Sequence, residues 1–234
     1  FDASTQEQGV TVNLTPGSWI HAGNKASSFA VLSHTQLTEE QLAGSPGKTL
    51  FNGDYFFNNT FAENQAFIGY GTQIENLIGS KHNDVLTGNK ADNAIYGGAG
   101  DDKINGDDGD DWLDGGAGND VLAGGKGNDT YIVGETGDQV VGEAAKGGND
   151  HVYSSVDYTL GNHLENLTLL GAALKGTGNA LNNQLTGNNL DNTLNGGAGN
   201  DVLKGGGGKD VLTGGTGNDQ FVFSSLLGGT VAVS

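Results

Sequence analysis

Residues 97–132 read GGAGDDKIN, GDDGDDWLD, GGAGNDVLA and GGKGNDTYI, four units of nine residues that follow one another without interruption. The consensus of the units is G-G-x-G-x-D-x-U-x, in which U is a large apolar residue. The pattern returns at residues 196–222 as GGAGNDVLK, GGGGKDVLT and GGTGNDQFV. The fixed phase of glycine, aspartate and apolar residue indicates a repeat architecture, because a flexible Gly-rich linker has no reason to keep it.

Degenerate units extend both runs toward the amino terminus. The first array spans residues 79–132 in six nonapeptides, and the second spans 178–222 in five. Position six of the repeat carries an acid or its amide, and position eight carries the apolar residue. The position-six residues are Asp84, Asn93, Asp102, Asp111, Asp120 and Asp129 in the first array, then Asn183, Asn192, Asp201, Asp210 and Asp219 in the second.

The repeat predicts how the chain winds. The segment G-G-x-G-x-D suits a turn and the segment x-U-x suits a short strand, so that two nonapeptides complete one coil. The apolar residue points inward, and coils must stack because a single repeat cannot bury its apolar face. Turns that are two nonapeptides apart become neighbours, which places Asp102 between Asp84 and Asp120. We therefore expect an all-β fold of two parallel β-rolls joined by an irregular β segment, with an amino-terminal β-rich flank.

Outside the arrays the pattern is less regular. Gly9–Leu14 alternates in the manner of a strand, and a Thr-x-x-Gln capping pattern favours a short helix at Thr38–Leu42. In the connecting segment, Val152–Leu160 and Leu164–Leu170 have strand-like composition. The expected divisions are an amino-terminal flank and cap at 1–78, the first roll at 79–132, the connecting segment at 133–177, and the second roll with a carboxy-terminal fragment at 178–234.

Charge and composition exclude several classes of protein. The chain has 28 acids against 10 bases, a formal net charge of −18, which disfavours binding to nucleic acid. No cysteine is present, so disulfides and thiolate metal sites are excluded. No stretch approaches the roughly 20 apolar residues that span a bilayer, so we expect no membrane span. The self-repulsion of the acids predicts that cations bind to the folded chain.

The phase of the acids indicates which cation. Carboxylates stacked roughly 4.8 Å apart, one strand spacing, repel each other unless a cation lies between them. Calcium accepts 6–8 oxygen ligands in irregular geometry, whereas magnesium requires a stricter octahedron. Zinc is disfavoured because cysteine and paired histidines are absent. The sequence therefore predicts several calcium ions.

The arrays resemble the RTX (hemolysin-type) calcium-binding nonapeptide-repeat module. In that family the ligands are the position-six carboxylate and backbone carbonyls around positions two and four. Asn93, Asn183 and Asn192 depart from the pattern, and an uncharged amide implies weaker sites. At His82 the resemblance implies the carbonyl as ligand and not the imidazole. The implied metal ligands are Ser80, His82, Asp84, Asn89, Ala91, Asn93, Gly98, Gly100, Asp102, Asp107, Gly109, Asp111, Gly116, Gly118, Asp120, Gly125, Gly127, Asp129, Asn192, Gly197, Gly199, Asp201, Gly206, Gly208, Asp210, Gly215, Gly217 and Asp219.

A finer resemblance involves the amino-terminal part of the chain. Residues 67–89, FIGYGTQIENLIGSKHNDVLTGN, together with residues 1–23, which begin FDAS and end VTVNLTPGSWIHAG, look like the start of the carboxy-terminal module of serralysin-type secreted metalloproteases. In that family the Glu of the I-E-N phrase ligates the first calcium, and Glu75 matches it. A similar phrase, LENL, returns at 164–167.

The chain shows no catalytic motif. No histidine begins an H-E-x-x-H zinc motif and no G-x-S-x-G nucleophile elbow is present, so we expect this chain to be non-catalytic. The resemblance implies a secreted, extracellular bacterial protein, export by a type I secretion apparatus, and a covalently attached catalytic or adhesive domain. Because the chain begins at Phe1 without methionine, we expect a fragment. We expect the module to drive calcium-dependent folding, stability and secretion of a serralysin-like metalloprotease. The alternatives for the parent are an RTX lipase, an adhesin in which this chain is a calcium-stiffened segment, or a polysaccharide-modifying enzyme in which it is an accessory module.

Overall fold

The computed structural model describes residues 9–14, 19–22, 48–51, 54–57, 65–67, 75–143, 147–223 and 232–233. Every regular element in these residues is a β-strand. None of them forms a helix with the length and hydropathy that a membrane crossing requires. The expected all-β fold is confirmed, and the helix expected at residues 38–42 falls outside the described residues.

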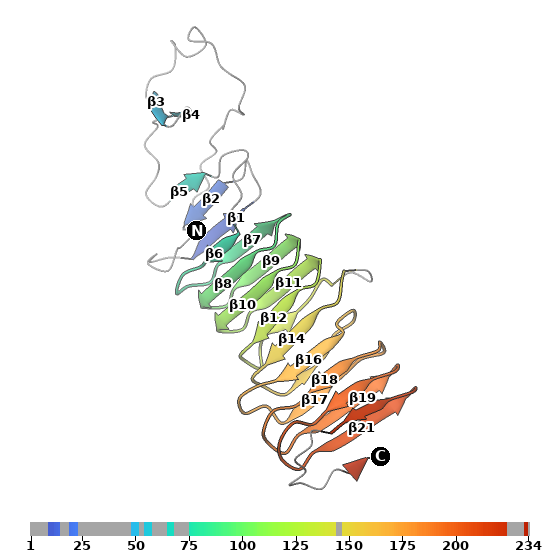
Figure 1. Cartoon of the computed structure of the whole chain (residues 1–234). Coiled ribbons are helices and arrows are strands. Elements are labelled where there is room, and N and C mark those ends of the chain that lie inside the picture. The colour runs from blue at the N-terminus through green and yellow to red at the C-terminus, as the bar shows by residue number, and fades with distance from the viewer. Residues whose placement is uncertain are drawn as a thin grey trace.

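One face of the molecule is a nine-stranded parallel sheet that runs along the whole stack (Figure 1). Its order is β22-β20-β18-β16-β14-β12-β10-β8-β6. Every second strand of the solenoid therefore lies on this face. The strands are β6 (Asn76–Ile78), β8 (Ala94–Ala99), β10 (Trp112–Ala117), β12 (Thr130–Val133), β14 (His151–Ser154), β16 (Asn166–Leu169), β18 (Gln184–Thr186), β20 (Val202–Lys204) and β22 (Gln220–Val222).

The opposite face is divided into two sheets. A seven-stranded sheet has the order β13-β11-β9-β7-β1-β2-β5, and a five-stranded sheet has the order β15-β17-β19-β21-β23. A separate hairpin pairs β3 (Lys48–Phe51) with β4 (Asp54–Phe57). The remaining strands are β1 (Val10–Asn13), β2 (Trp19–Ala22), β5 (Gln65–Phe67), β7 (Val85–Asn89), β9 (Lys103–Asp108), β11 (Val121–Lys126), β13 (Gln139–Val140), β15 (Tyr158–Thr159), β17 (Lys175–Thr177), β19 (Thr193–Ala198), β21 (Val211–Thr216) and β23 (Ala232–Val233).

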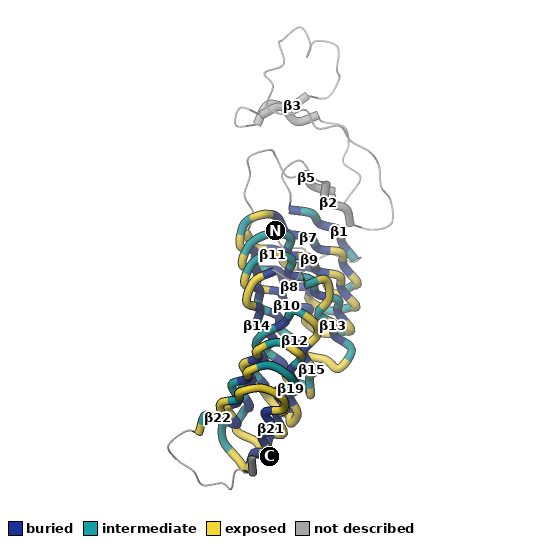
Figure 2. The backbone as a smooth tube through the Cα atoms, turned by 90° about the vertical axis from the view of Figure 1, so that its right-hand side faces the viewer, coloured by how far each residue is buried: buried dark blue, intermediate teal, exposed yellow. Residues whose placement is uncertain are grey.

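Register follows the predicted coil of two nonapeptides. Leu113 pairs with Ile95 on one side and Tyr131 on the other, and Leu122 pairs with Ile104 on the opposite face. The position-eight side chains are buried and form the core, while the turns lie on the outside of the stack (Figure 2). The buried position-eight residues are Leu86, Ile95, Ile104, Leu113, Leu122, Tyr131, Leu185, Leu194, Leu203 and Leu212, and Phe221 is partly buried against them.

The connecting segment continues the nine-stranded sheet. Tyr131 pairs with Val152, and the coil between them is longer than two nonapeptides. Val152 pairs with Leu167, and the coil between these two is shorter than two nonapeptides. The long coil and the short coil together have the length of four nonapeptides, so the phase is restored and Leu167 pairs with Leu185. The segment expected to join two rolls therefore supplies coils of one continuous stack. The division at residues 132 and 177 stays a prediction.

The amino-terminal strand closes the first end of the stack. β1 pairs in parallel with β7 and antiparallel with β2. The side chains of Val10, Val12 and Leu14 are buried against the core, as the alternation at residues 9–14 predicted. This strand covers the edge that the first coil leaves open, which is the role expected of a cap.

Candidate metal centre

The position-six side chains form an inner ladder of hydrogen bonds along the stack. The N–H of Asp84 donates to Oδ1 of Asp102 at 2.7 Å, and the N–H of Asp102 donates to Oδ1 of Asp120 at 2.8 Å. On the other edge, the N–H of Asp111 donates to Oδ1 of Asp129 at 2.9 Å. These aspartates are at most 2 % exposed. Each carboxylate is therefore held in the turn by the backbone of the preceding coil.

Position five forms an outer ladder in which each N–H donates to the preceding coil, whereas in the inner ladder each N–H donates to the following coil. The N–H of Asn119 donates to Oδ1 of Asp101 at 2.9 Å, and the N–H of Asn128 donates to Oδ1 of Asp110 at 2.7 Å. These contacts are exposed. The consensus has a variable residue at position five and did not indicate this ladder. The signal was the Asn or Asp that precedes position six in almost every unit, with Lys209 as the exception.

One oxygen of many of the inner carboxylates has no hydrogen-bond partner. While Oδ1 accepts from the backbone, Oδ2 is buried and unpartnered in Asp102, Asp111, Asp120, Asp129 and Asp201. A buried carboxylate oxygen without a donor is costly in free energy unless a cation or proton reaches it. These oxygens are the expected ligands of a metal ion in the turn.

Glycine at position one makes room for that oxygen. A Cβ added at Gly97 would overlap Oδ2 of Asp102 and would approach the carbonyl oxygen of Gly115 to 2.5 Å. The carboxylate of one turn and the carbonyl of the next turn thus converge on the space beside Gly97. The position-one carbonyl was not among the ligands that the resemblance implied, and its place beside the carboxylate makes it a further candidate.

The carbonyls at positions two and four also face the neighbouring coil. Gly116 has φ +91°, and a Cβ there would overlap the carbonyl oxygen of Gly98. Glycine at position four repeats the arrangement, because a Cβ at Gly118 would overlap the carbonyl oxygen of Gly100. The structure thus brings the predicted half-site of Gly98, Gly100 and Asp102 into one turn. The units that start at Gly106, Gly115, Gly124, Gly196, Gly205 and Gly214 have glycines of positive φ at the corresponding positions, with Asp107 in place of glycine at one of them.

The first unit of the array differs from the regular ones. Both carboxylate oxygens of Asp84 accept hydrogen bonds: Oδ2 accepts from the N–H of Ser80 at 2.6 Å, and Oδ1 accepts from the Ser80 hydroxyl and the N–H of Val10. Asp84 therefore holds the capping strand β1 against the stack. Glu75 is exposed beside β6, and its role as a calcium ligand stays a prediction.

The amide-bearing units keep the geometry of the turn. Oδ1 of Asn93 accepts from the N–H of Asn89 at 2.8 Å, and the N–H of Asn93 donates to Oδ1 of Asp111 at 2.7 Å. In the second array the N–H of Asn192 donates to Oδ1 of Asp210 at 2.9 Å. The backbone N–H of each asparagine therefore donates to the next coil as in the regular units, while the Asn93 side-chain oxygen accepts within its own turn.

Burial makes the inner carboxylates hard to ionise. Desolvation, with a smaller contribution from the neighbouring acids Asp84 and Asp120, raises the pKa of Asp102 to about 7. Desolvation and the charge of Asp129 raise the pKa of Asp111 to about 7 in the same way. Desolvation is also the main cause that raises the pKa of Asp120. A cation beside the unpartnered oxygens would offset this electrostatic cost.

In the regular turns, carboxylate oxygens of position six and backbone carbonyl oxygens of the glycines lie close together. This donor set suits a hard cation with many oxygen ligands, and calcium fits it best. Sequence analysis missed two acids that continue the inner ladder beyond the first array. Oδ1 of Asp138 accepts from the N–H of Asp120 at 3.1 Å, and Oδ1 of Asp150 accepts from the N–H of Asp129 at 2.9 Å. Their signals were the spacing of two nonapeptides from Asp120 and the Gly-Asn-Asp phrase at 148–150.

Comparison with known families supports this interpretation. A family model described as RTX calcium-binding nonapeptide repeat, in four copies, matches residues 71–104, 78–113, 96–131, 105–140 and 186–221. These ranges cover the first array and most of the second. No curated protein matches the chain.

Proposed function

Because residues 71–140 and 186–221 are RTX calcium-binding nonapeptide repeats, we propose that this chain is the calcium-triggered folding module of a larger secreted bacterial protein. The observation that carries the proposal is the row of buried, unpartnered Oδ2 atoms in the turns. When bound, calcium supplies the positive charge and coordination that these oxygens otherwise lack.

The residues of the chain do the rest. Position-one glycines leave the space beside each carboxylate open, and the inner ladder fixes Oδ1 so that Oδ2 faces that space. The position-six N–H of each turn also donates a hydrogen bond to the next coil. Ordering one turn therefore places the donor that positions the carboxylate of the next turn. Free energy of binding therefore appears as free energy of folding.

The proposed setting is export followed by folding. In the low calcium of the cytosol the acidic arrays would stay unfolded and suited to a type I secretion apparatus. Extracellular modules bind calcium at about 10⁻⁴–10⁻³ M, which places folding outside the cell. The chain itself would be non-catalytic and would serve a covalently attached domain.

The proposed parent is a serralysin-like metalloprotease, supported by the resemblance of residues 67–89 and by the capping strand β1 on Asp84. A second candidate, a calcium-stiffened adhesin segment, is favoured by the unbroken nine-stranded sheet. The sequence of the parent gene upstream of Phe1 distinguishes them: an H-E-x-x-H motif supports the protease, and further repeats support the adhesin. An RTX lipase would show a G-x-S-x-G motif there instead.

Circular dichroism tests the folding proposal. We expect metal-stripped protein at neutral pH to give a disordered spectrum, and calcium in the range of about 10⁻⁴–10⁻³ M to convert it cooperatively to a β spectrum. Magnesium at the same concentrations is the control and should act weakly. A β spectrum that is independent of metal would overturn the proposal.

A further inference from the structure

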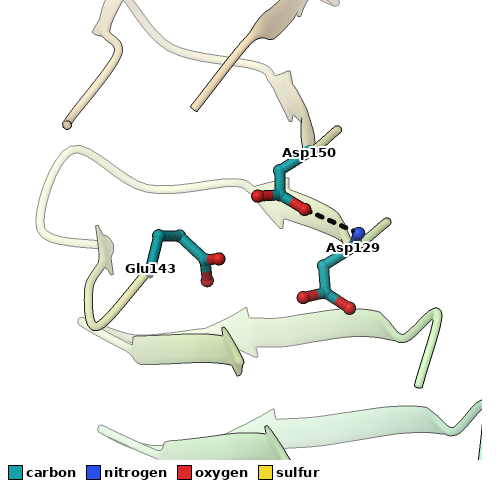
Figure 3. Close-up of side chains that lie close together, drawn as sticks. All are labelled: Asp129, Glu143 and Asp150. Atoms are coloured by element: carbon teal, nitrogen blue, oxygen red, sulfur yellow. Dashed lines mark hydrogen bonds between the residues drawn. The ribbon is translucent and has the colours of Figure 1, made fainter. Parts of the chain in front are cut away.

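Three carboxylates meet at the junction between the two arrays. Asp129 lies in the last turn of the first array, Glu143 follows β13, and Asp150 directly precedes β14. One ligand oxygen from each lies within 4.8 Å of the others, and Figure 3 shows the Glu143 carboxylate facing those of Asp129 and Asp150. Glu143 and Asp150 lie outside the residues that match the repeat family.

Each of the three carboxylates is fixed by one of its oxygens. Oδ1 of Asp129 accepts from the N–H of Asp111, and Oδ1 of Asp150 accepts from the N–H of Asp129, both at 2.9 Å. Oε1 of Glu143 accepts from the Tyr131 hydroxyl. Their positions are therefore set by the stack itself.

The second oxygen of each carboxylate is buried and has no hydrogen-bond partner: Oδ2 of Asp129, Oε2 of Glu143 and Oδ2 of Asp150. Asp129 and Asp150 are 1 % and 0 % exposed. In the described part of the chain the lysine–carboxylate ion pairs are those of Asp108 with Lys90 and Lys126, on the surface. Among the described residues, no lysine is therefore paired with any of these three acids.

The spacing suits a single ion. Two oxygens that bind one calcium at about 2.4 Å can lie no further apart than about 4.8 Å, and the three carboxylates meet this limit. Glu143 also lines a cavity of about 380 Å³ together with Val140, Asn162 and His163.

We propose that Asp129, Glu143 and Asp150 form a divalent-cation site that joins one repeat carboxylate to two acids from outside the repeats. The choice of calcium as the ion rests on the proposed function. The site lies where the coil between Tyr131 and Val152 is longer than two nonapeptides. It fixes the segment that follows β13 to the last turn of the first array, and so carries the stack into the connecting segment.

Two variants and a control test the site. Glu143→Gln and Asp150→Asn each keep an oxygen to accept the existing hydrogen bond and place an amide NH₂ at the unpartnered position, where it cannot ligate. Glu135→Gln makes the same change of charge at an exposed residue of the same region. Bound calcium per chain is measured by equilibrium dialysis and atomic emission, with circular dichroism to confirm folding in calcium.

We expect each site variant to bind one calcium fewer than Glu135→Gln, which should match the wild type. Equal numbers in all proteins would overturn the site while leaving the proposed function intact, and a wild type that binds no calcium would overturn the proposed function first. Should the variants fail to fold, a wild-type crystal grown with calcium decides. Density at about 2.3–2.6 Å from oxygens of all three residues supports the site, and its absence refutes it.

Discussion

The N–H of Asp102 donates to Oδ1 of Asp120 across two adjacent coils, and the Oδ2 atom of the same Asp120 side chain has no partner. The two oxygens of one carboxylate thus have separate roles. One joins coils, and the other is free to accept a ligand. An isosteric change can remove the second role and keep the first.

Asp120→Asn should have opposite effects with and without calcium. The amide keeps Oδ1 as acceptor for Asp102 but removes the charge, so the calcium concentration at half-folding should rise about tenfold, equivalent to about 1.4 kcal/mol. Without metal, the variant should be the more stable protein because a buried charge has been removed. Calcium titrations followed by circular dichroism measure both effects. An unchanged midpoint would show that Oδ2 is not a ligand.

The metal-free protein should be more stable in acid than at neutral pH. Burial raises the pKa of Asp102 and Asp111 to about 7 from the usual value of 3.8. Between pH 3.8 and about 7 the folded state holds protons that the unfolded state has lost. Stability is therefore greatest at about pH 4 and falls as the pH rises to about 7. In calcium the stability should instead rise with pH, because protons compete with the ion for the carboxylates. Circular dichroism of the metal-free protein should show β structure gained as the pH is lowered from about 7 to about 4, and thermal unfolding in calcium gives the second slope. The same pH dependence with and without calcium would contradict the assignment.

Asp107→Gly should stabilise the calcium-bound protein. Asp107 is a non-glycine residue with φ +86° at position two, where the regular units have glycine. Relieving this left-handed conformation should contribute about 1 kcal/mol, while the backbone carbonyl is retained.

Gly116→Ala is the matched change in the other direction, since its Cβ would overlap the carbonyl oxygen of Gly98. It should destabilise by more than Asp107→Gly stabilises. Urea unfolding in calcium measures both variants. A loss of stability in Asp107→Gly would mean that the Asp107 carboxylate itself takes part in binding.

Leu122→Ala should destabilise the folded stack by about 2–5 kcal/mol, because Leu122 is fully buried between Ile104 and Val140 on adjacent strands. Leu122→Met, which conserves volume, should cost less than about 1.5 kcal/mol. Urea unfolding at saturating calcium gives the two values. Similar effects of both substitutions would argue against close packing of the position-eight ladder.

The repeats could be interpreted from sequence because each position does one physical task. Position eight packs in the core, position six carries the side chain of the inner ladder, and glycine turns the chain, so the coil of two nonapeptides could be predicted from the repeat. Pairs such as Asp102 and Asp120 were correctly placed side by side. The resemblance to the RTX module is confirmed, whereas the serralysin-type parent stays a proposal.

The junction could not be interpreted in that way. The lengthened coil between Tyr131 and Val152, and its correction at Leu167, depend on how an irregular coil packs against its neighbours. Glu143 comes close to Asp129 only because of that detour. No periodic signal marks such a contact, and the sequence predicted an irregular β segment at 133–177 without indicating that it continues the nine-stranded sheet.

The two faces of the stack are not interchangeable, because one is unbroken and the other is divided between β13 and β15. Deleting a single nonapeptide would move every later strand to the opposite face. Strands of the divided face would then have to pair with strands of the unbroken face. Removing two adjacent nonapeptides would only shorten the molecule. The length of the stack can therefore change only by whole coils, and insertions and deletions that still fold should add or remove repeats in pairs.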